Sequence, residues 1–571
     1  MEKMLSYELL IHKGSPFELQ DAVIKGIHCK VFPRGPQTLQ DVFLKAAVFA
    51  GREFIIKDDT RLTFGQALQR GNHFARSIQQ RFNIKKGSRA ALVMETGPEW
   101  AVVFMAFCFA GITPVLIPID TNGRAIVKAL ELTNCELVVA DLSSAGKIKA
   151  SGMKRPVVIS VMRQPDAISY WACGILSDFS IFNLAETPDD KNSAYIDETH
   201  VTSPDDEALI SFTSGTTGKP KGIVHSHRNI TTGLMNMMLG GLRMSFCAAK
   251  DGRKQSYIAQ PCSLVLSPFS YIGGYSQLML MCYLGGKIVL MDDWNAKHAT
   301  NLIENERIRA LCGLSPAMAK DLLRANQSTD NLRSLKNINI HGFALHRKFI
   351  REIADTFTYI SLGTGYGMTE TCGAISVVSA MELLDNPELS GRVLPSVNVK
   401  IVDFCGREAT QGKHGEIWIH GAMVMQGYCF GEDNSNVLLE DGWLKTGDLG
   451  YMDSTGNLCV TGRLDMLRCG KKRVSSSKLE RLICELDAVD EAAVLGVPDS
   501  EQGTDIAVAI IPNSTIQVDV SELTRKVSDC VKAHVDDIMV VIMKDIPRTA
   551  SGKTDRRALQ MQIRNKYVGA A

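Results

Sequence analysis

Short apolar runs alternate with longer amphipathic stretches along most of the chain from Thr38 onward. The apolar runs at residues 90–94, 137–140 and 157–159 have the length of buried strands, whereas residues 64–82 show the hydrophobic spacing of a helix. Alternation of this kind is typical of parallel sheets with helices on both faces. It predicts an α/β fold for this part of the chain.

Residues 100–119 form a nearly uncharged apolar run that is long enough to raise the question of a membrane span. Gly111 and Pro114 divide the run, so we predict a buried helix over residues 98–110 and a short strand over residues 115–119. Asp120 and Asn122 then supply turn chemistry. No integral membrane segment is therefore expected.

The remaining pattern divides the chain further. A second α/β region is predicted over residues 263–363, and a β-rich subdomain with Gly and Asp turns over residues 398–460. The sequence thus predicts an α/β protein with a large N-terminal domain of two α/β subdomains plus a β-rich subdomain, and a small, mobile α+β C-terminal domain. The expected limits are an N-terminal arm at 1–37, the N-terminal domain at 38–463 and the C-terminal domain at 464–571.

Composition narrows the class of protein. The chain has 571 residues, 45% hydrophobic and 22% charged, with a net charge of +1, which is typical of globular proteins and gives no electrostatic reason to expect nucleic acid as a partner. Its 15 cysteines include no Cys-x-x-Cys pair, so reduced thiols are expected rather than a zinc site or a disulfide framework. Acidic residues near the start exclude a secretion signal, and the last residues carry no retention or peroxisomal signal, so we expect a cytoplasmic protein.

The richest motif is residues 213–222, which hold three glycines, four hydroxyl residues and two lysines. Glycines let backbone N–H groups turn inward around an anion, and the apolar run 208–212 before them reads as a buried strand. A strand followed by a Gly-rich loop is where α/β sheets bind phosphate. Pro220 follows Lys219, so the loop is not of the Walker A type.

This loop closely resembles the phosphate loop of the adenylate-forming superfamily, which includes acyl- and aryl-CoA synthetases, adenylation domains of peptide synthetases and beetle luciferases. Further motifs follow in the family's order, so the resemblance spans about residues 38–559. It implies a catalytic role for Thr217. It also implies that ATP is bound by Thr213, Ser214, Gly215, Thr216, Gly218 and Lys221.

Two motifs resemble the family's nucleotide-binding elements. Residues 366–371 match a motif whose tyrosine, here Tyr366, packs on adenine, with Gly367 and Thr369 beside it. Its glutamate, Glu370, is implied to be catalytic and to hold Mg²⁺, because a hard carboxylate oxygen suits that ion. Residues 443–448 match Trp-x-x-Thr-Gly-Asp, so Asp448 is implied to accept hydrogen bonds from both ribose hydroxyls.

Residues 342–345 resemble the Gly-Gly-Ala turn that lines the adenine and acyl pocket. Gly342 and Ala344 are implied to contact the nucleotide, and Phe343 stands where a second glycine is common, which changes the expected pocket width.

Residues 462–465 resemble the hinge motif. Arg463 is implied to reach ribose or phosphate, and Asp465 to mark the pivot between domains. The interval to Gly470 is shorter than usual, and Ser476 replaces a common proline. The charge run 471–473 is interpreted as a solvated turn.

Residues 547–554 match the C-terminal lysine motif, which implies that Lys553 contacts the substrate carboxylate and the α-phosphate. An ammonium group suits a site where negative charge builds up on phosphorus.

Residues 268–274 resemble the acyl-pocket motif, in which Tyr271, Gly273 and Gly274 line the substrate pocket together with Phe343. In amino-acid-activating domains an aspartate in this region pairs with the α-amino group, but no acidic residue lies between positions 268 and 276. Because an unpaired buried ammonium is costly, amino acids are disfavoured as substrates. Residues 234–239, rich in Met, are interpreted as core, and His225 and His227 receive no catalytic role.

The resemblance implies AMP-forming activation of a carboxylic acid by Mg²⁺ and ATP, followed by transfer to the thiol of CoA. The alternative is an acyl-AMP ligase that loads the phosphopantetheine of a carrier protein. A luciferase-like monooxygenase is a third reading, disfavoured because that activity is rare in the superfamily. A non-catalytic nucleotide-binding relative is a fourth, and the presence of Lys553, Glu370 and Asp448 argues against it.

Overall fold

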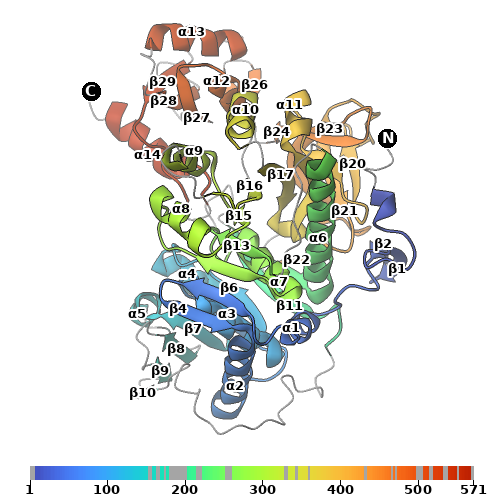
Figure 1. Cartoon of the computed structure of the whole chain (residues 1–571), viewed down its shortest axis with the longest axis vertical. Helices are drawn as coiled ribbons and strands as arrows, with labels where there is room; N and C mark the ends of the chain where they lie inside the picture. Colours follow the sequence, from blue (N-terminus) through green and yellow to red (C-terminus); the bar gives the residue numbers. More distant parts are fainter. Residues whose placement is uncertain are drawn as a thin grey trace.

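A large and a small domain make up the molecule (Figure 1). The computed structural model describes residues 7–151, 153, 157–161, 168–172, 175–178, 202–213, 221–250, 260–326, 332–340, 345–357, 360–429, 434–464, 467–469, 472–496, 506–513, 519–531, 538–549 and 552–567.

The first sheet of the large domain has nine strands in the order β10-β9-β8-β7-β5-β6-β11-β12-β22. Its centre is parallel, and β12 and β22 extend it antiparallel beside β11. The strands are β5 (Arg89–Val93), β6 (Thr113–Leu116), β7 (Leu137–Asp141), β8 (Val157–Val161), β9 (Ile168–Ala172), β10 (Ile175–Asp178), β11 (Glu207–Thr213), β12 (Lys221–Ser226) and β22 (Gly427–Tyr428).

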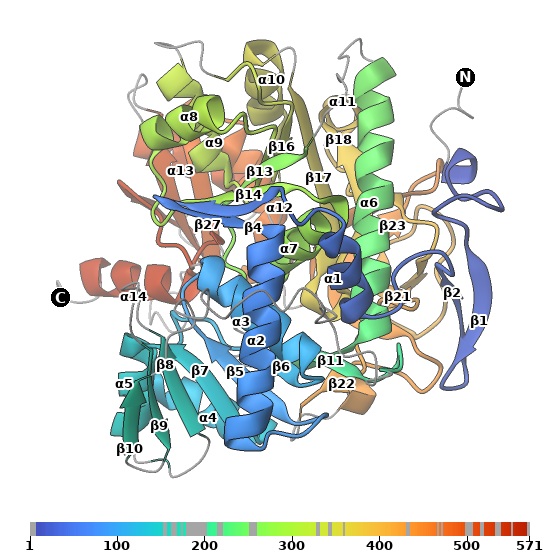
Figure 2. The ribbon, with the colours of Figure 1, turned by 60° about the horizontal axis from the view of Figure 1, so that its bottom comes forward.

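Helices cover both faces of this sheet, as predicted. Alternate residues of β5 and β7 face two different cores: Leu92 and Val139 join the core of α2 and α3, whereas Val93 and Val138 join that of α4 and α5. Figure 2 shows α2 crossing one face of the sheet. The helices are α1 (Leu39–Ala47), α2 (Phe64–Phe82), α3 (Pro98–Phe109), α4 (Gly123–Thr133) and α5 (Leu142–Ala150).

Local sequence sets the ends of these helices. The predicted helix 64–82 coincides with α2, which starts at a capping box formed by Thr63 and Gln66 and ends at Asn83 in the left-handed conformation. The run 100–119 is divided into a helix and a strand as predicted, but the strand covers Thr113–Leu116 instead of residues 115–119, because Pro114 is accommodated inside β6. None of the described helices is long and apolar enough to cross a membrane.

The second sheet has thirteen strands in the order β20-β21-β23-β24-β19-β18-β17-β16-β15-β13-β14-β3-β4. The predicted β-rich region is present, and its strands continue this sheet through β18 and β19. The strands are β3 (Glu53–Lys57), β4 (Thr60–Thr63), β13 (Cys262–Val265), β14 (Lys287–Leu290), β15 (Ala310–Cys312), β16 (Asn337–Asn339), β17 (Ser361–Met368), β18 (Gly373–Ser379), β19 (Gly391–Val393), β20 (Asn398–Val402), β21 (Gly415–His420), β23 (Leu444–Met452) and β24 (Asn457–Arg463).

Further helices pack around the second sheet. They are α6 (His227–Lys250), α7 (Ile272–Leu284), α8 (Ala296–Asn305), α9 (Pro316–Asn326), α10 (Arg347–Thr356) and α11 (Ala380–Asp385). The long helix α6 runs beside β18 and the β-rich strands (Figures 1 and 2).

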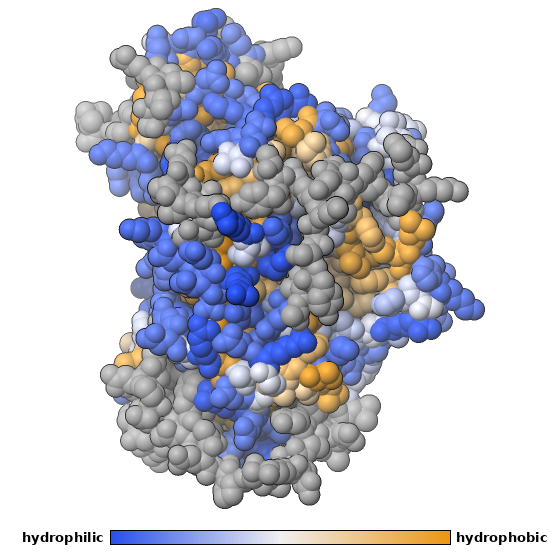
Figure 3. Space-filling view, in the orientation of Figure 1, coloured by the Kyte–Doolittle hydropathy of each residue, from blue (hydrophilic) through white to orange (hydrophobic). Residues whose placement is uncertain are grey.

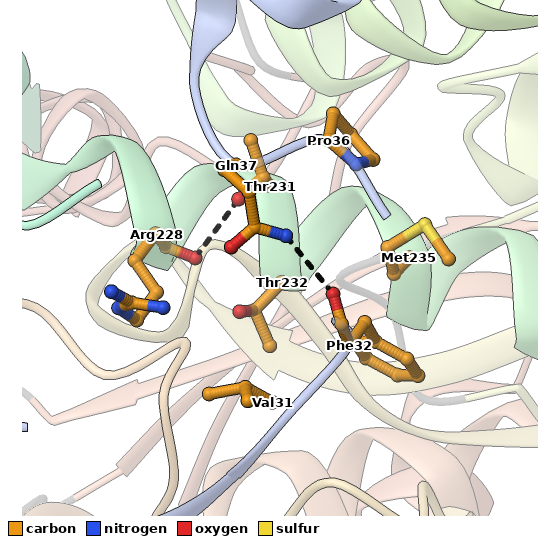
Figure 4. Close-up of a pocket in the computed structure, with 8 residues that line it drawn as sticks. All are labelled: Val31, Phe32, Pro36, Gln37, Arg228, Thr231, Thr232 and Met235. Carbon is orange, nitrogen blue, oxygen red and sulfur yellow. Dashed lines mark hydrogen bonds between the residues drawn. The ribbon is translucent and has the colours of Figure 1, made fainter. Parts of the chain in front are cut away.

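The N-terminal arm forms a hairpin of β1 (Gln20–Ile24) and β2 (Ile27–Val31), and then packs on α6. Phe32 is buried beside Met235, and the Gln37 amide donates to the carbonyl of Phe32 at 3.1 Å (Figure 4). The gap between arm and helix has a volume of only about 10 Å³, roughly one water. The arm is therefore part of the large domain's packing.

The small domain contains a three-stranded sheet of β27 (Val489–Gly496), β28 (Ile506–Pro512) and β29 (Ile538–Ile542), a hairpin of β25 (Leu467–Cys469) and β26 (Lys472–Val474), and helices α12 (Ser476–Cys484), α13 (Val520–Val531) and α14 (Arg556–Tyr567). Its surface is mainly hydrophilic on the face shown in Figure 3. The predicted limit between the domains, after residue 463, stays a prediction.

Ion pairs join the two domains. A basic group on α9 and a main-chain N–H of α10 meet acidic groups of the small domain: the Lys320 ammonium lies 3.1 Å from an Asp490 carboxylate oxygen, and the Arg347 main-chain N–H donates to Glu485 at 2.8 Å. On the other side of the contact, Arg481 of α12 reaches Glu388 at 3.3 Å. The side chains of Lys320 and Asp490 are 12% and 20% exposed, so this pair is largely shielded from solvent.

The core around α3 generates a prediction about stability. Phe104 is 1% exposed and stacks on Trp100 with 5.2 Å between ring centroids. We expect Phe104→Ala to lower the free energy of unfolding by about 3–5 kcal/mol, because it leaves a cavity. Phe404, 82% exposed, provides the matched control, and Phe404→Ala should change stability by less than about 0.5 kcal/mol. Urea unfolding measures both, and equal losses would contradict the burial.

Candidate active site

The phosphate-loop motif lies at the carboxyl end of β11, at the edge of the first sheet where the chain turns back into β12. Thr213 and Lys221 are directly opposite each other in the antiparallel pair, so the motif forms the tip of a hairpin. Ser214, Gly215, Thr216, Thr217 and Gly218 lie outside the described residues. What the structure defines is the base from which this loop projects.

Tyr428 links Lys221, at the start of β12, to Glu370, the candidate metal ligand. The Lys221 ammonium lies 5.1 Å from the ring centroid of Tyr428, and the Tyr428 hydroxyl donates to Glu370 at 2.9 Å. The Glu370 main-chain carbonyl also accepts from the N–H of Met425 at 2.8 Å. Glu370 is thereby linked to Lys221 at the start of β12, and its carboxylate retains the hard oxygen lone pairs that Mg²⁺ takes from a protein.

A second pair of contacts surrounds Asp448. The Tyr366 hydroxyl donates to one carboxylate oxygen at 2.5 Å, and the Arg463 guanidinium lies 3.1 Å from the other. Burial raises the pKa of Tyr366 well above its ordinary value, and the charge of Asp448 adds to the effect. The phenol therefore remains a proton donor at ordinary pH, and it anchors Asp448 through its hydroxyl.

Local structure presents Asp448 to these partners. The Thr446 hydroxyl accepts from the Asp448 N–H at 3.0 Å and donates to Ile417. Gly447 has φ +70°, a conformation that favours glycine, and it allows the strand to bulge just before the carboxylate. Asp448 and Arg463 are register partners in β23 and β24, so their contact follows from strand pairing.

The turn after β17 requires a glycine at position 367. A Cβ at Gly367 would lie 2.1 Å from the carbonyl oxygen of Gly373, so any side chain would displace the β17–β18 hairpin. Thr369 and Glu370 follow in a short 3₁₀ turn, Thr369–Thr371, and this turn directs Glu370 toward Tyr428.

The acyl-pocket motif joins the two sheets. The Phe269 N–H donates to the Thr96 hydroxyl at 3.0 Å, and the Tyr271 hydroxyl lies 3.1 Å from both carboxylate oxygens of Asp120. Thr96 and Asp120 belong to loops of the first sheet, whereas Phe269 and Tyr271 follow β13 of the second. Positions 268–276 of the sequence contain no acidic residue. In the folded chain, however, the carboxylate of Asp120 contacts this segment through Tyr271.

Two glycines at the start of α7 allow it to pack closely against the loop after β13. A Cβ at Gly274 would lie 2.1 Å from the Pro268 carbonyl, while one at Gly273 would lie 3.3 Å from the Ser267 hydroxyl. Gly342, Phe343 and Ala344 lie outside the described residues, so the predicted width of the pocket stays a prediction. Asp465 lies outside them as well.

Hydrogen bonds within the small domain hold the backbone at Lys553. Its main-chain carbonyl accepts from the Thr549 N–H at 2.8 Å, and Gly552 has φ +81°. Arg548 donates to the Gly552 carbonyl at 3.0 Å and pairs with Glu491. The Lys553 side chain is exposed, and among the described residues no hydrogen bond or ion pair joins it to Glu370 or Asp448.

The two histidines after the phosphate loop are buried. The His225 Nδ1 lies 3.1 Å from the Cys372 sulfur, and burial lowers the pKa of His225 to about 3. The His227 Nδ1 accepts from the Leu39 N–H at 3.2 Å, and burial lowers its pKa to about 4. Both rings are therefore neutral at ordinary pH, and the absence of a catalytic role stays a prediction.

Sequence reasoning missed Tyr428 and Asp120. Tyr428 is 58 positions from Glu370, and Asp120 is 151 positions from Tyr271. Tyr428 lies in a two-residue strand, which is too short to show a hydrophobic periodicity in the sequence. Asp120 carried only a turn signal, although its position directly after the strand predicted over residues 115–119 placed it at the edge of a sheet.

Comparison with known proteins defines the class. The model of the AMP-binding enzyme family matches residues 42–429, and that of the AMP-binding enzyme C-terminal domain matches residues 478–553. The chain belongs to the AMP-binding enzyme family and is an AMP-forming ligase.

Relatives in this family include named CoA ligases. A 3-[(3aS,4S,7aS)-7a-methyl-1,5-dioxo-octahydro-1H-inden-4-yl]propanoyl:CoA ligase of Rhodococcus jostii is 27% identical over 542 residues, covering 92% of this chain and 98% of that protein. An indoleacetate–CoA ligase of Aromatoleum aromaticum is 28% identical over 366 residues, covering 64% and 68% of the two chains.

Solved structures share the fold. The o-succinylbenzoate CoA synthetase of Bacillus subtilis, in complex with its acyl-adenylate intermediate, has a TM-score of 0.69 at 23% identity and covers 91% of this chain and 97% of its own. A benzoate CoA ligase of Burkholderia xenovorans has a TM-score of 0.73 at 20% identity, with coverages of 91% and 99%.

The contact between Tyr366 and Asp448 generates a binding prediction. We expect Tyr366→Phe to raise the dissociation constant for AMP about tenfold, because Asp448 loses the hydrogen bond from the phenol and is held by Arg463 alone. Titration calorimetry measures it. Tyr451, whose hydroxyl donates to Glu388 at 2.8 Å, is the control, and Tyr451→Phe should leave AMP binding within about twofold. Equal weakening by both variants would exclude a specific role for Tyr366.

Proposed function

We propose that this enzyme activates a carboxylic acid with ATP to an acyl-adenylate, releasing pyrophosphate, and then transfers the acyl group to the thiol of CoA. One observation carries the proposal. Lys221 contacts Tyr428, and Tyr428 contacts Glu370. Four residues before Glu370 in the same segment, Tyr366 contacts Asp448. This arrangement supports neighbouring phosphate-, metal- and ribose-binding roles for these residues.

In the first step a carboxylate oxygen bonds to the α-phosphorus, and the bond to the bridging oxygen breaks as pyrophosphate leaves. No protein nucleophile is required, because positioning and charge stabilisation lower the barrier. Mg²⁺, when bound, would neutralise phosphate charge, and Glu370 would hold it.

The chain's other residues orient the reactants in this scheme. The phosphates lie against Thr213, Ser214, Gly215, Thr216, Thr217, Gly218 and Lys221. Adenine and ribose contact Gly342, Ala344, Tyr366, Gly367, Thr369, Asp448 and Arg463, and the acid lies against Tyr271, Gly273, Gly274 and Phe343. Lys553 supplies positive charge to the reacting carboxylate and α-phosphate.

In the second step the thiol loses its proton to solvent, its sulfur bonds to the acyl carbon, and AMP leaves. The 464–571 domain turns about Asp465 between the steps. The named CoA ligases among the relatives support CoA as the acceptor, and a carrier-protein phosphopantetheine is the alternative acceptor.

Lys553 gives the sharpest test of the first step. We expect Lys553→Ala to lower adenylation by ~10²–10³, or about 3–4 kcal/mol, as for loss of one transition-state donor. Thioester formation from pre-made acyl-adenylate should be spared. Exposed Lys544 is the control, and Lys544→Ala should change neither step. Equal loss in both half-reactions of Lys553→Ala would refute the assigned role.

A panel of carboxylic acids, each with and without CoA, tests the overall function. Pyrophosphate release with Mg²⁺ and ATP that is matched by acyl-CoA formation is the expected result. Slow release that CoA leaves unchanged, with adenylate retained on the enzyme, would point to a carrier protein. No release with any acid would overturn the proposed function.

A further inference from the structure

The acyl-pocket motif contacts the loop after β6 through the side chains of Tyr271 and Asp120. The Tyr271 hydroxyl lies 3.1 Å from each carboxylate oxygen, so one donor is shared between two acceptors. Burial raises the pKa of Tyr271 above its ordinary value, and the charge of Asp120 raises it further, which keeps the phenol protonated. The tyrosine is therefore a donor whose direction Asp120 determines.

The two residues arrive at this contact from different sheets. Asp120 follows β6 of the first sheet, and Tyr271 caps the start of α7 after β13 of the second. Each belongs to a loop at the carboxyl end of a parallel strand, where α/β proteins bind ligands. A second link, from the Phe269 N–H to Thr96 at 3.0 Å, joins the loop of Tyr271 to the neighbouring loop after β5 of the first sheet.

The charge of Asp120 is available to a ligand. Its side chain is exposed, and among the residues that the structure describes it takes part in no ion pair. Tyr271 is half-buried beside it. Hydrogen bonding by a neutral phenol leaves the carboxylate with its full negative charge and with unused lone pairs.

We propose that Asp120 is a positioning and specificity-determining residue of the acid site: it orients Tyr271 and selects substrates by the charge at their far end. Acids with a second carboxylate are repelled, neutral acids are accepted, and acids with a terminal ammonium are favoured. The inference rests on the proposed function, because that function places Tyr271 in the acid pocket.

The test compares acids of one length that differ in terminal charge. Hexanoate, adipate and 6-aminohexanoate form an aliphatic series, and the 4-methyl, 4-carboxy and 4-aminomethyl derivatives of phenylacetate form an aryl series. Pyrophosphate release gives kcat/KM for each acid with wild type, Asp120→Asn, Asp120→Ala and Tyr271→Phe. Asp59→Asn, at an exposed turn between β3 and β4, is the control for net charge.

Asp120→Asn removes the charge but keeps an oxygen that accepts from Tyr271. Relative to the neutral acid of the series, kcat/KM should rise about tenfold for the dicarboxylate and fall about tenfold for the ammonium acid. Added salt should shrink both changes. Opposite responses of the two charged acids are an electrostatic signature that a loss of structure does not produce.

The other variants separate orientation from charge. Asp120→Ala should repeat the shifts in selectivity and also raise KM for the neutral acid, because Tyr271 is no longer held. Tyr271→Phe should raise that KM while keeping wild-type selectivity for charge. The KM for ATP should stay within about twofold in all of these variants, because the nucleotide contacts lie elsewhere.

Two results would overturn the inference. The first is an active enzyme whose selectivity ratios are the same in wild type and Asp120→Asn. The second is a parallel rise of KM for ATP and for every acid in Asp120→Asn, which marks a structural role. No pyrophosphate release by wild type with any acid would overturn the proposed function, and this inference with it.

Discussion

The shared carboxylate of Asp448 is the interaction on which the site depends. One oxygen is held by Tyr366 of β17 and the other by Arg463 of β24, so a single side chain ties the middle of the thirteen-stranded sheet to its β-rich strands. The Asp448 carboxylate is largely buried whereas Arg463 is about half exposed, so losing Tyr366 would leave the carboxylate with only the more exposed partner. The position of Tyr366, and with it the direction of the turn that carries Glu370, follows from this arrangement.

Loop contacts between the two sheets have a comparable place at the predicted acid pocket. Hydrogen bonds from Phe269 to Thr96 and from Tyr271 to Asp120 add to the apolar packing of Phe269 on Trp100. Such links set direction at a modest cost in stability. They leave the loops at the surface, where a ligand can reach the same polar groups that align them.

Helices, strands and motifs could be predicted individually from the sequence, but the contacts between them could not. The helix 64–82 was predictable to the residue because Thr63, Gln66 and Asn83 mark its ends chemically. The strand β3 gave no signal that it would leave the first α/β region and pair with β14 of the second sheet. Tyr428 and Asp120 acquire their roles through pairing across long stretches of chain, and one sequence contains no direct record of such pairing.

The two-step reaction that we propose requires Lys553 to approach the reacting groups in one step and to leave them in the other. Hydrogen bonds from Arg548 and Thr549 hold the main chain at Gly552 and Lys553 within the small domain, so in this proposal the lysine would move with that domain. The domain in turn is held by ion pairs such as Lys320 with Asp490 and Arg481 with Glu388. A polar contact between domains is more easily separated than a large apolar interface. In the proposed reaction, the contacts that position the lysine and the contacts that would have to separate to withdraw it therefore lie in different parts of the structure.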